Sequence, residues 1–577
     1  MNSELARAFE NIADLLQITG ADTFRVNSYR RVSRTIRDLA DDVRTLHEAG
    51  VLQEVKGIGK GTAGKIEEFL ETGRIALLDE LSKEVPAGLP RLLEIPGLGP
   101  KTIALIHSAL KVSSISDLKQ AIASGSLAEL PGLGAQSVKK IADGIAFLEA
   151  SKGRTPRGIA WAVAENYLTQ LRSLPDVERV EIAGSLRRGL ETIGDVDLLC
   201  ISDAGAEVVR RFTTHPGVKR VLAAGPTKGS IVVDLEGGAE LQVDLRVVPA
   251  ASFGATWQYF TGSKEHNVRL RERAGQRGWK LNEWGLHDGD EMLAGATEEE
   301  IYARLELPCM PPEVREDREE FAAGAAFDDL VSAADIRGDL HTHTTASDGK
   351  NSIEEMAAAA RALGYKYLAI TDHSRSSTIA NGLSLARMRE HIAAIRAANA
   401  RLKGFTLLVG CECDILPNGD LDYPDELLAE CDWVVASIHA AMGKGGRGKL
   451  SPTERTLKAI ANRYVCVIGH PTGRLINRRE AMELDMPRIV AAAHDTGTAL
   501  EVNASWQRLD LKDLHVRQAI QAGVRLCIDT DAHRTTQLAA ITHGVATARR
   551  GWARRGDVLN TLPLKDLKAW VARKRRG

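Results

Sequence analysis

The chain has 577 residues, enough for about four domains at roughly 150 residues each. Hydrophobic residues make up 44% of it and charged residues 26%, and 75 Lys and Arg against 77 Asp and Glu leave a formal net charge of −2. These ordinary values exclude a uniformly basic nucleic-acid coat protein and an acidic disordered protein, but they allow a local basic surface.

The chain shows no sign of a membrane span or of a targeting segment. No apolar run reaches the roughly 20 residues that a membrane helix needs. The first residues form an amphipathic pattern that includes acids, unlike a signal or transit peptide. The 7 cysteines are scattered without a CxxC pair, so we expect buried, reduced thiols in a cytoplasmic protein.

Residues 1 to about 150 are predicted to form short helices separated by glycine turns, and one pattern recurs in them. An apolar residue between two glycines precedes a helix start in VKGIGKGTAGKI, IPGLGPKTIALI and LPGLGAQSVKKI. Such turns expose backbone N–H groups that can bind a phosphate oxygen without contacting a base. A connector that only packs is the alternative. The residues concerned are Gly57, Gly59, Lys60, Gly97, Gly99, Lys101, Gly132 and Gly134.

Three copies of the pattern, two with a lysine directly after the glycines, favour phosphate binding. The segment from Arg25 to Arg37 adds five arginines and no acid, which indicates a positive stripe for a nucleic-acid backbone. These motifs resemble helix–hairpin–helix motifs. We therefore expect a helical domain at 1–85 and a second DNA-binding hairpin region at 86–155.

The following segment, from about residue 155 to 305, changes to α/β character and contains a carboxylate motif. Asp195 and Asp197 lie two residues apart on a predicted strand, so their side chains share a face, and Asp244 on a later strand can join them. Three adjacent carboxylates repel one another unless cations bind between them. Two Mg²⁺ ions held in this way suit nucleotidyl transfer, with Ser185 and Arg188 placed to hold a triphosphate.

The motifs GSLRRG, GDVDLL, VDLR and YFTGS resemble those of family X DNA polymerases, the group that contains DNA polymerase beta, over about residues 5 to 305. The resemblance implies a polymerase-like nucleotidyltransferase core at 156–310 and Asp195, Asp197 and Asp244 as catalytic ligands of Mg²⁺. It also implies contacts with the incoming deoxynucleoside triphosphate by Gly184, Ser185, Arg188, Gly194, Tyr259, Phe260, Gly262 and Asn267.

Lys65 matches the family's Schiff-base lysine, which removes a deoxyribose phosphate. Such a lysine must be partly deprotonated, and the sequence gives no evidence for that. Arg25 stands where family members with strong lyase activity have another lysine. A lyase nucleophile and a simple phosphate contact therefore remain two open interpretations of Lys65.

A Pro- and charge-rich stretch that begins at Pro308 indicates a linker, expected at 311–335. From Ile336 onward, seven predicted strands alternate with Ala-rich helices, which indicates a parallel α/β domain at 336–577. Six of these strands end in His, Asp or Glu. The candidate metal ligands there are His341, His343, Asp348, His373, Glu412, His439, His470, Asp531 and His533.

Mixed His and carboxylate ligands suit Mn²⁺ or Zn²⁺, and nine of them indicate two or three ions. HTHTTASDG, TDHS, GHPTGR and TDAH resemble the polymerase and histidinol phosphatase (PHP) domain, a distorted (β/α)7 barrel that hydrolyses phosphoesters. Arg474 either holds a phosphate or forms a salt bridge. His391, His494, His515 and His543 lie on predicted helices and receive no role.

The sequence therefore predicts a multidomain bacterial repair polymerase of family X that fills short gaps in DNA, with a PHP domain acting on 3′ ends or abasic sites. The expected partners are gapped or primer-template DNA and deoxynucleoside triphosphates, and we expect a cytoplasmic, nucleoid-associated monomer. Two alternatives remain open: a template-independent transferase, and a DNA end-binding scaffold with vestigial sites.

Overall fold

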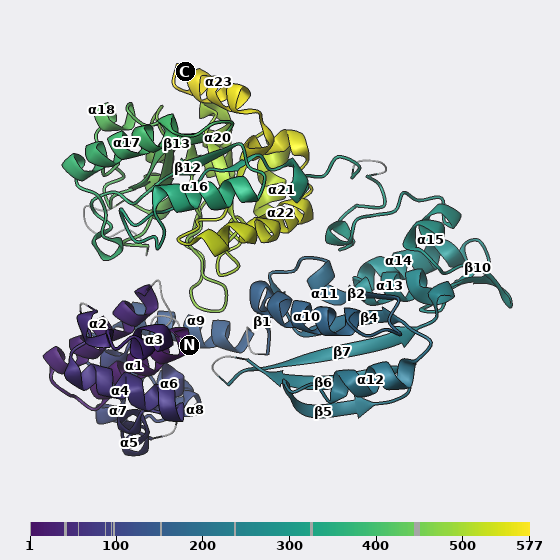
Figure 1. Cartoon of the computed structure of the whole chain (residues 1–577), viewed down its shortest axis with the longest axis horizontal. Helices are drawn as coiled ribbons and strands as arrows, with labels where there is room; N and C mark the ends of the chain where they lie inside the picture. The colour runs from purple at the N-terminus through teal and green to yellow at the C-terminus, as the bar shows by residue number, and fades with distance from the viewer. Residues whose placement is uncertain are drawn as a thin grey trace. The chain divides into compact units, whose positions relative to one another are not determined.

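The computed structural model describes residues 2–39, 43–55, 57–86, 88–93, 95, 98–150, 153–235, 238–323, 327–442 and 450–576. The chain divides into two compact units (Figure 1). One comprises Met1–Lys152 with Asn477–Glu480, and the other comprises Gly153–Ile476 with Ala481–Gly577. Gly97 lies outside the described residues.

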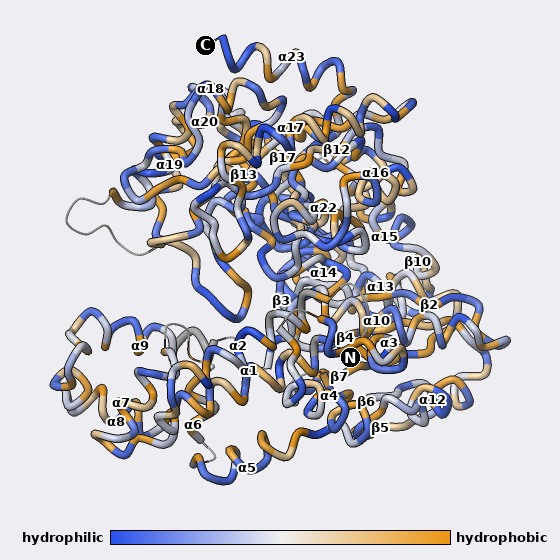
Figure 2. Tube along the Cα trace, turned by 60° about the vertical axis from the view of Figure 1, so that its left-hand side comes forward, coloured by the Kyte–Doolittle hydropathy of each residue, from blue (hydrophilic) through white to orange (hydrophobic). Residues whose placement is uncertain are grey.

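The first unit is helical. In α1, Leu5, Phe9, Ile12 and Leu16 recur at the spacing of one helix face, and all four are buried in the core of the unit. Hydrophobic residues, orange in Figure 2, recur in the same way along the other helices. The helices are α1 (Asn2–Ile18), α2 (Thr23–Asp38), α3 (Val43–Glu48), α4 (Lys60–Thr72), α5 (Ala76–Glu84), α6 (Leu89–Leu92), α7 (Pro100–Leu110), α8 (Ile115–Ala123) and α9 (Ala135–Ala150).

The second unit begins with a five-stranded mixed sheet in the order β2-β4-β7-β6-β5, in which β4 and β7 are parallel. Helices α10 and α12 pack on its strands. The strands are β2 (Arg179–Ile182), β4 (Asp195–Ile201), β5 (Val218–Ala224), β6 (Lys228–Asp234) and β7 (Glu240–Val248), and the helices are α10 (Arg157–Arg172), α11 (Gly184–Arg187) and α12 (Gly205–Thr213). Strands β1 (Thr155–Pro156) and β3 (Thr192–Ile193) form a separate antiparallel pair.

Alternation along β7 places Leu241, Val243 and Leu245 in the hydrophobic core and Asp244 on the opposite face. A smaller region follows, with its own hydrophobic cluster and an antiparallel sheet in the order β10-β9-β8. It comprises α13 (Phe253–Thr261), α14 (Lys264–Gly275), β8 (Lys280–Leu281), β9 (Leu286–Asp288), β10 (Glu291–Ala294) and α15 (Glu298–Arg304).

The stretch expected as a linker is packed against this smaller region. The guanidinium of Arg315 is buried and lies 2.5 Å from Glu298, and the carboxylate of Glu320 is buried 2.9 Å from His266. Buried charges need such partners. The described part of 311–335 therefore belongs to the folded body of the second unit.

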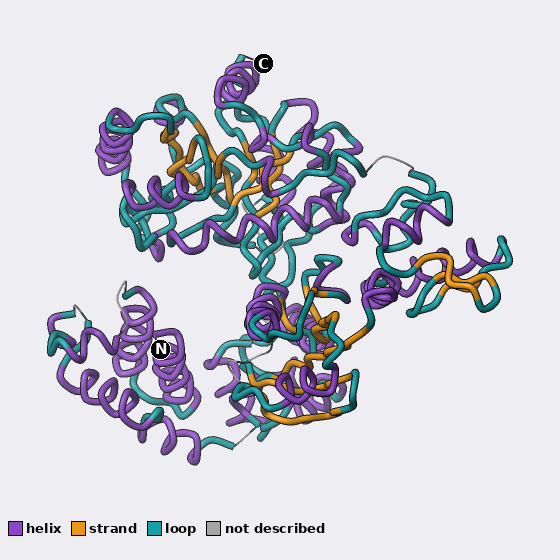
Figure 3. The backbone as a smooth tube through the Cα atoms, turned by 45° about the vertical axis from the view of Figure 1, so that its right-hand side comes forward, coloured by secondary structure: helices purple, strands orange, loops and turns teal. Residues whose placement is uncertain are grey.

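Seven parallel strands follow in chain order, as the sequence predicts, and helices surround them (Figure 3). A parallel bridge between Thr342 and Ala532 joins the two edges and nearly closes a barrel. The strands are β11 (Gly338–Asp339), β12 (Tyr367–Ile370), β13 (Thr406–Asp414), β14 (Trp433–Ser437), β15 (Val467–Ile468), β16 (Ala499–Asn503) and β17 (Leu526–Asp529). The helices are α16 (Ile353–Ala362), α17 (Leu385–Ala400), α18 (Asp425–Leu428), α19 (Pro452–Ile460), α20 (Met486–Thr496), α21 (Asp513–Gln521), α22 (Ile541–Arg550) and α23 (Leu564–Lys574).

Successive residues of the barrel strands enter two different cores. Tyr367 and Ala369 pack in one core with Leu567 of α23, whereas Leu368 and Ile370 pack in the other. On β13, Leu408 belongs to the first core, so Glu412 lies on the same face of the strand four residues further on. The carboxyl ends of the strands thus turn polar residues toward one end of the barrel.

None of the 7 cysteines forms a disulfide, and six are buried as predicted; Cys309 is exposed, contrary to the prediction. Cys309 follows α15 in the packed segment rather than a barrel or sheet strand. Within the described residues, no helix has both the length and the apolar character needed to cross a membrane.

Candidate active sites

Parallel pairing of β4 and β7 brings the three predicted aspartates together. Asp197 lies directly opposite Asp244, and Asp195 lies two residues before Asp197 on the same face. One carboxylate oxygen from each of the three lies within 4.8 Å of the others. The sequence prediction that these residues form one cluster therefore agrees with the geometry.

The electrostatics of this cluster favour a bound cation. Burial and the neighbouring carboxylates of Asp195 and Asp244 raise the pKa of Asp197 to about 7, and burial also raises the pKa of Asp244. Oxygen donors of this kind are the ligands that Mg²⁺ prefers. The residues present therefore fit a divalent ion, which would relieve their mutual repulsion.

Gly184 lies against the cluster. Its φ is +63°, and a Cβ built on it would lie 2.2 Å from Oδ2 of Asp197. No other residue type has room there, because both the backbone conformation and the close approach require glycine. The GS motif thus places the start of α11 directly beside the three clustered carboxylates.

The two arginines of GSLRRG are held by other protein groups. Arg187 pairs with Glu298 at 2.6 Å, and Arg188 pairs with Glu316 at 3.1 Å and also donates to the carbonyl of Thr261. Arg188 was predicted to hold a triphosphate. Its guanidinium links the end of α11 to Thr261 and to Glu316, and its contact with a nucleotide stays a prediction.

Asn267 also has protein partners, although it was predicted to contact the nucleotide. Its amide nitrogen donates to the carbonyl of Tyr259 at 2.7 Å, and its amide oxygen accepts from Gln258 at 2.7 Å. The side chain is mostly buried. Asn267 thus holds the end of α13 in place, whereas Tyr259 and Phe260 are half-buried, with rings edge to face 5.1 Å apart.

The carboxyl end of the barrel gathers all nine predicted metal ligands. Seven of them form three overlapping groups, two of which include Glu412, and the eighth, His470, lies 2.9 Å from Oε1 of that carboxylate. Asp531 lies 3.2 Å from Nε2 of His343. The three groups are His343, Asp348, His373 and His533; His341, His343 and Glu412; and His373, Glu412 and His439.

Several buried atoms of this cluster have no hydrogen-bond partner. They are Nε2 of His341, both ring nitrogens of His343, Nδ1 of His373 and of His470, and Oε2 of Glu412. Nδ1 of His373 lies 2.9 Å from Oε2 of Glu412 but without hydrogen-bond geometry, as when lone pairs converge on a common point. Unsatisfied buried polar atoms are costly and rare, so their concentration here fits bound metal ions.

The charge states agree with metal binding. Burial and the neighbouring histidines His533 and His373 lower the pKa of His343 to about 4, so its ring is neutral and can act as a ligand. Although burial disfavours its charge, the histidines His439, His373 and His341 hold the pKa of Glu412 well below its usual range. Although burial disfavours their charge, neighbouring carboxylates raise the pKa of His341 and of His439 in the ion-free protein. An ion bound beside Glu412 would therefore displace protons from these rings.

Sequence reasoning missed the carboxylates that orient these histidines. Nδ1 of His341 lies 2.7 Å from Glu501, and Nδ1 of His439 hydrogen-bonds Asp414. His391, which was given no role, lies 2.8 Å from Asp372, a residue that also accepts from the backbone N–H of Thr344. Such outer carboxylates fix the ring orientation of metal-binding histidines. Asp414 and Asp372 lie at or just beyond the carboxyl ends of strands, which was the available signal, whereas Glu501 lies in the middle of β16 and gave none.

Arg508 is a second residue that was missed. Its Nε lies 3.7 Å from Asp531, and its Nη1 is buried without a hydrogen-bond partner, so it can receive a phosphoryl oxygen beside the cluster. Of the two interpretations of Arg474, a phosphate contact or a salt bridge, the structure favours the salt bridge, because the guanidinium lies 2.7 Å from Glu191. No motif marked Arg508, since it belongs to the loop after β16.

In the first unit, the residue between the two glycines is buried in all three hairpins: Ile58, Leu98 and Leu133. Gly59 and Gly99 form the N-caps of α4 and α7, and Lys60 and Lys101 beside them are exposed. Gly57 and Gly132 have positive φ, and Gly134 directly precedes α9. The turns thus pack through one apolar side chain and leave their glycines at exposed helix starts.

The arginine-rich segment forms α2. Arg25 and Arg31 are exposed, while Arg30 is engaged by Asp14 at 3.1 Å and so does not contribute to a free stripe. Phe24, which the sequence reasoning passed over, is 81% exposed beside Arg25. An exposed aromatic ring among cations is typical of a surface that stacks on nucleobases.

Comparison with known families agrees with this arrangement. Family models match residues 1–75 (helix-hairpin-helix domain), 89–146 (SAM-like helix-hairpin-helix tandem), 256–316 (DNA polymerase beta thumb) and 339–505 (PHP domain). These matches confirm the predicted helix–hairpin–helix region, polymerase-like core and PHP barrel.

Among individual proteins, the chain is 39% identical over 572 residues to the DNA polymerase/3′-5′ exonuclease PolX of Bacillus subtilis, covering 99% of both chains. It is 25% identical to DNA polymerase lambda of Rattus norvegicus, over 55% of this chain and 56% of that one. A probable phosphatase of Thermoanaerobacter sp. is 26% identical over 41% of this chain and 95% of its own. The chain belongs to the bacterial family X DNA polymerases that carry a C-terminal PHP domain.

Proposed function

We propose that the protein is a template-directed DNA polymerase that fills short gaps in base excision repair, and that its PHP domain hydrolyses DNA at 3′ ends or abasic sites. The observation that carries the polymerase function is the cluster of Asp195, Asp197 and Asp244 on parallel strands with Gly184 against it. The Bacillus subtilis relative, named as a polymerase and a 3′-5′ exonuclease, supports both activities.

In the polymerase site, the chain supplies oriented carboxylates and a loop for the nucleotide. Two Mg²⁺ ions, when bound, supply charge that activates the attacking oxygen and neutralises the leaving pyrophosphate. Ser185 lies on α11 next to Gly184, and Tyr259 and Phe260 lie at the end of α13, where they can flank the sugar. A half-buried wall of two aromatic rings suits discrimination against a ribose hydroxyl.

In the barrel, the chain holds nine ligands in fixed orientations. Mn²⁺ or Zn²⁺, when bound, supplies Lewis acidity and an acidified water. Glu501 and Asp414 orient His341 and His439, and Arg508 presents a guanidinium group to the phosphodiester. This arrangement supports hydrolysis of a phosphoester rather than a purely structural metal site, because a phosphate-binding cation lies beside the ligands.

Primer extension on a gapped duplex tests the polymerase function. With Mg²⁺ and all four deoxynucleoside triphosphates, we expect template-directed filling, and a stronger response when the gap carries a 5′ phosphate. Extension that ignores the template base would show the template-independent transferase instead. Absence of any transfer would leave the end-binding scaffold.

A separate assay tests the barrel. Duplexes with a mismatched 3′ end or an abasic site should be hydrolysed with Mn²⁺, and a chelator should abolish the reaction. Comparing the two substrates distinguishes an exonuclease from an abasic-site endonuclease. If reloading with Mn²⁺ or Zn²⁺ yields no hydrolysis of DNA or of small phosphoesters, the barrel is a metal-stabilised scaffold.

DNA and deoxynucleoside triphosphates are the proposed partners, with the exposed hairpin starts and α2 as the DNA-binding surfaces of the first unit. We further propose that the protein acts as a monomer associated with the nucleoid in the cytoplasm. Size-exclusion chromatography with light scattering tests the monomeric state.

A further inference from the structure

Helix α22 of the PHP barrel contacts the polymerase core at Gly189, in the turn that follows α11. A Cβ built on Gly189 would lie 3.3 Å from Cβ of Ala546 and 3.7 Å from Cδ of Arg550. The carbonyl of Gly189 accepts from the buried guanidinium of Arg157 at 3.2 Å. The turn after α11, the helix that begins with Gly184 and Ser185, therefore contacts a helix of the PHP barrel.

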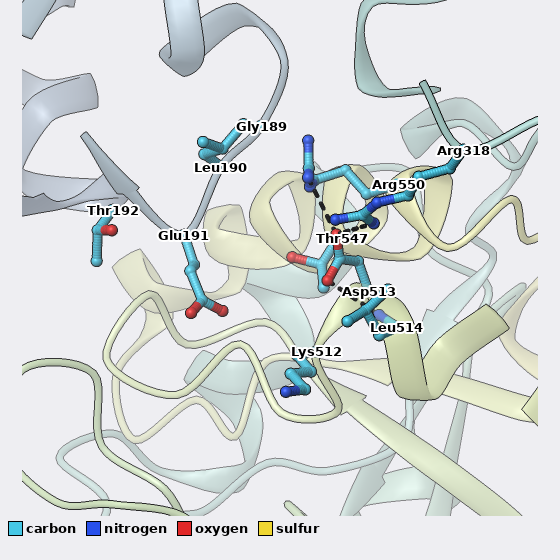
Figure 4. A pocket seen from close by; sticks show the side chains of 10 residues that line it. All are labelled: Gly189, Leu190, Glu191, Thr192, Arg318, Lys512, Asp513, Leu514, Thr547 and Arg550. Atoms are coloured by element: carbon cyan, nitrogen blue, oxygen red, sulfur yellow. Dashed lines mark hydrogen bonds and ion pairs between the residues drawn. The ribbon is translucent and has the colours of Figure 1, made fainter. Parts of the chain in front are cut away.

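A chain of alternating charges runs through this contact, and Figure 4 shows the part of it formed by Arg318, Asp513 and Arg550. Nη1 of Arg550 lies 2.8 Å from Glu316 and donates to the carbonyl of Arg188 at 2.9 Å. Its Nη2 lies 3.0 Å from Asp513, which Arg318 also contacts at 2.9 Å. Only 8% of the Arg550 side chain is exposed, so these pairs are weakly screened by solvent.

Charged groups rather than a continuous apolar core join the two elements at this place. A cavity of about 330 Å³ lies beside the charges, between residues 189–192 on one side and Lys512, Leu514 and Thr547 on the other. Beside this space, Arg550 donates a hydrogen bond to the carbonyl of Arg188 at the end of α11.

Arg188 is fixed from two sides. It donates to the carbonyl of Thr261, and its Nε lies 3.1 Å from Glu316, the same carboxylate that Arg550 holds. Without Arg550, the carboxylate of Glu316 would have Arg188 as its one remaining partner of the two, and its position would no longer be fixed by the barrel. The orientation of Arg188 beside the aspartate cluster thus depends on a residue of the barrel.

We propose that Arg550, a residue of the PHP domain, is a positioning residue for nucleotide binding in the polymerase site, acting through Glu316 on Arg188. The proposal rests on the polymerase function proposed above. It goes beyond that function because it makes affinity for the nucleotide depend on a helix of the other catalytic domain.

Replacement of Arg550 tests the proposal, and the adjacent Arg549 provides a matched control. Arg549 lies on the same helix, but it pairs with Glu313 at 2.8 Å and donates to the carbonyl of Val331 rather than to Arg188. In the full chain, Arg550→Met should raise KM for the deoxynucleoside triphosphate about tenfold, with kcat changed by less than about threefold. The reason is that the buried carboxylate of Glu316 would lose one of its two arginine partners and would no longer hold Arg188 in one orientation. Arg549→Met should leave KM within about twofold of wild type.

Equilibrium binding separates affinity from chemistry. The dissociation constant of the nucleotide, measured with a primer that ends in a dideoxynucleotide, should rise in parallel with KM in Arg550→Met. Hydrolysis by the barrel, measured in the same preparation, should stay at the wild-type rate and shows that the variant is folded. An unchanged dissociation constant in folded Arg550→Met overturns the proposal.

Glu316→Gln provides a second, independent variant, and it carries the test if Arg550→Met does not fold. It should raise the dissociation constant to a similar extent, and the double variant should be little worse than either single one, because both break the same link. Full additivity of the two effects would contradict the proposed route through Glu316. A wild-type protein that adds no nucleotide would instead disprove the polymerase function itself.

Discussion

Single atoms decide the identity of several residues around the aspartate cluster. Gly184 must be glycine because a Cβ would lie 2.2 Å from the carboxylate of Asp197. Asp197 in turn lies opposite Asp244 and two residues after Asp195. Burial and the charges of these two carboxylates raise its pKa more than Arg246 and Arg188 lower it. The negative charge of the cluster is thus concentrated where a cation can bind.

We predict that Asp244→Ala abolishes nucleotide addition while hydrolysis by the barrel persists. Asp244 completes the carboxylate set on β7, whereas the barrel has its own ligands on other strands. Primer extension and Mn²⁺-dependent hydrolysis measured on one preparation provide the check. Extension at the wild-type rate would remove Asp244 from the mechanism, and loss of both activities would indicate misfolding or obligatory coupling.

The pKa of Asp197 predicts a pH dependence. Burial, Asp195 and Asp244 raise this pKa to about 7 in the ion-free protein, so below that pH an incoming cation must displace a proton. Affinity for Mn²⁺ should therefore rise from about pH 6 to about pH 8 and then level off, as measured by calorimetry.

The same shift also affects stability. Because the folded-state pKa lies above the usual value of 3.8, this carboxyl contributes stability below about pH 4 that is lost as the pH rises through about 7.

Asp197→Asn removes the titrating group. An unaltered pH profile of Mn²⁺ affinity in that variant would show that another group is responsible.

At the scale of elements, the hairpins of the first unit combine one buried apolar residue with exposed glycines. Gly59 and Gly99 adopt ordinary negative φ values, and a Cβ on either would meet no atom within 4 Å. Gly57 differs, because its φ is +103° and a Cβ would lie 2.9 Å from Thr35. Substitution at Gly59 or Gly99 thus tests access to the amides without straining the fold.

We predict that Gly59→Val and Gly99→Val weaken DNA binding equally for all sequences, because amides that bind phosphate do not contact bases. Affinity of the wild type should fall steeply with salt as counterions are released. Fluorescence anisotropy with several duplex sequences measures both effects. Gly64→Ala within α4, where a Cβ also meets open space, serves as the control, and a sequence-dependent loss would contradict the hairpin interpretation.

The lyase interpretation of Lys65 has its own test. Nζ of Lys65 donates to the carbonyl of Gly61 at 3.2 Å, one turn earlier on α4, and the pair is exposed. If Lys65 is a Schiff-base nucleophile, borohydride should trap the wild type covalently on incised abasic DNA, and Lys65→Ala should form no adduct. A wild type that forms no adduct would leave Lys65 as a phosphate contact.

At the scale of the whole molecule, two clusters of candidate metal ligands lie on two different sheets of one compact unit. The aspartates belong to the mixed sheet, and the histidine-rich ligands belong to the parallel barrel. The ion pairs of Arg550 and Arg549 link the barrel to Glu316 and Glu313, in the packed segment that precedes the barrel in the chain. The clusters share no residue, so each should lose its metal without destroying the other.

We therefore predict that the double variant His341→Ala, His343→Ala loses Mn²⁺-dependent hydrolysis but retains Mg²⁺-dependent polymerisation. Both histidines face Glu412 at the centre of the barrel cluster, at 3.4 and 3.6 Å. Metal analysis of the purified protein should show fewer bound ions than in wild type. Retained hydrolysis would exclude these histidines from the metal site, and loss of polymerisation would reveal dependence of one site on the other.

The sequence by itself was sufficient for the elements and for the members of both clusters. Period-two strands, glycine pairs before helices and acids or histidines at strand ends are local patterns. They identified the seven barrel strands, the three hairpins and the nine residues that the structure brings together at one end of the barrel. Metal binding by these nine residues stays a prediction. Strand alternation alone was enough to place Asp195 and Asp197 on one face.

Only the tertiary structure decided which polar groups are engaged by other parts of the chain. Arg188 and Asn267 were predicted to contact the nucleotide, and in the structure they also bind Glu316 and Gln258, respectively. Glu501 and Arg508 belong to no motif, but they lie beside the histidine-rich cluster. The sequence after Pro308 was interpreted as a linker because it is rich in charged residues. In the structure, its buried charges pair with residues outside the segment, such as Glu298 and His266, and the sequence does not reveal such partners. A side chain's partner depends on which strands become neighbours, and that is set by the packing of the whole core rather than by spacing along the chain.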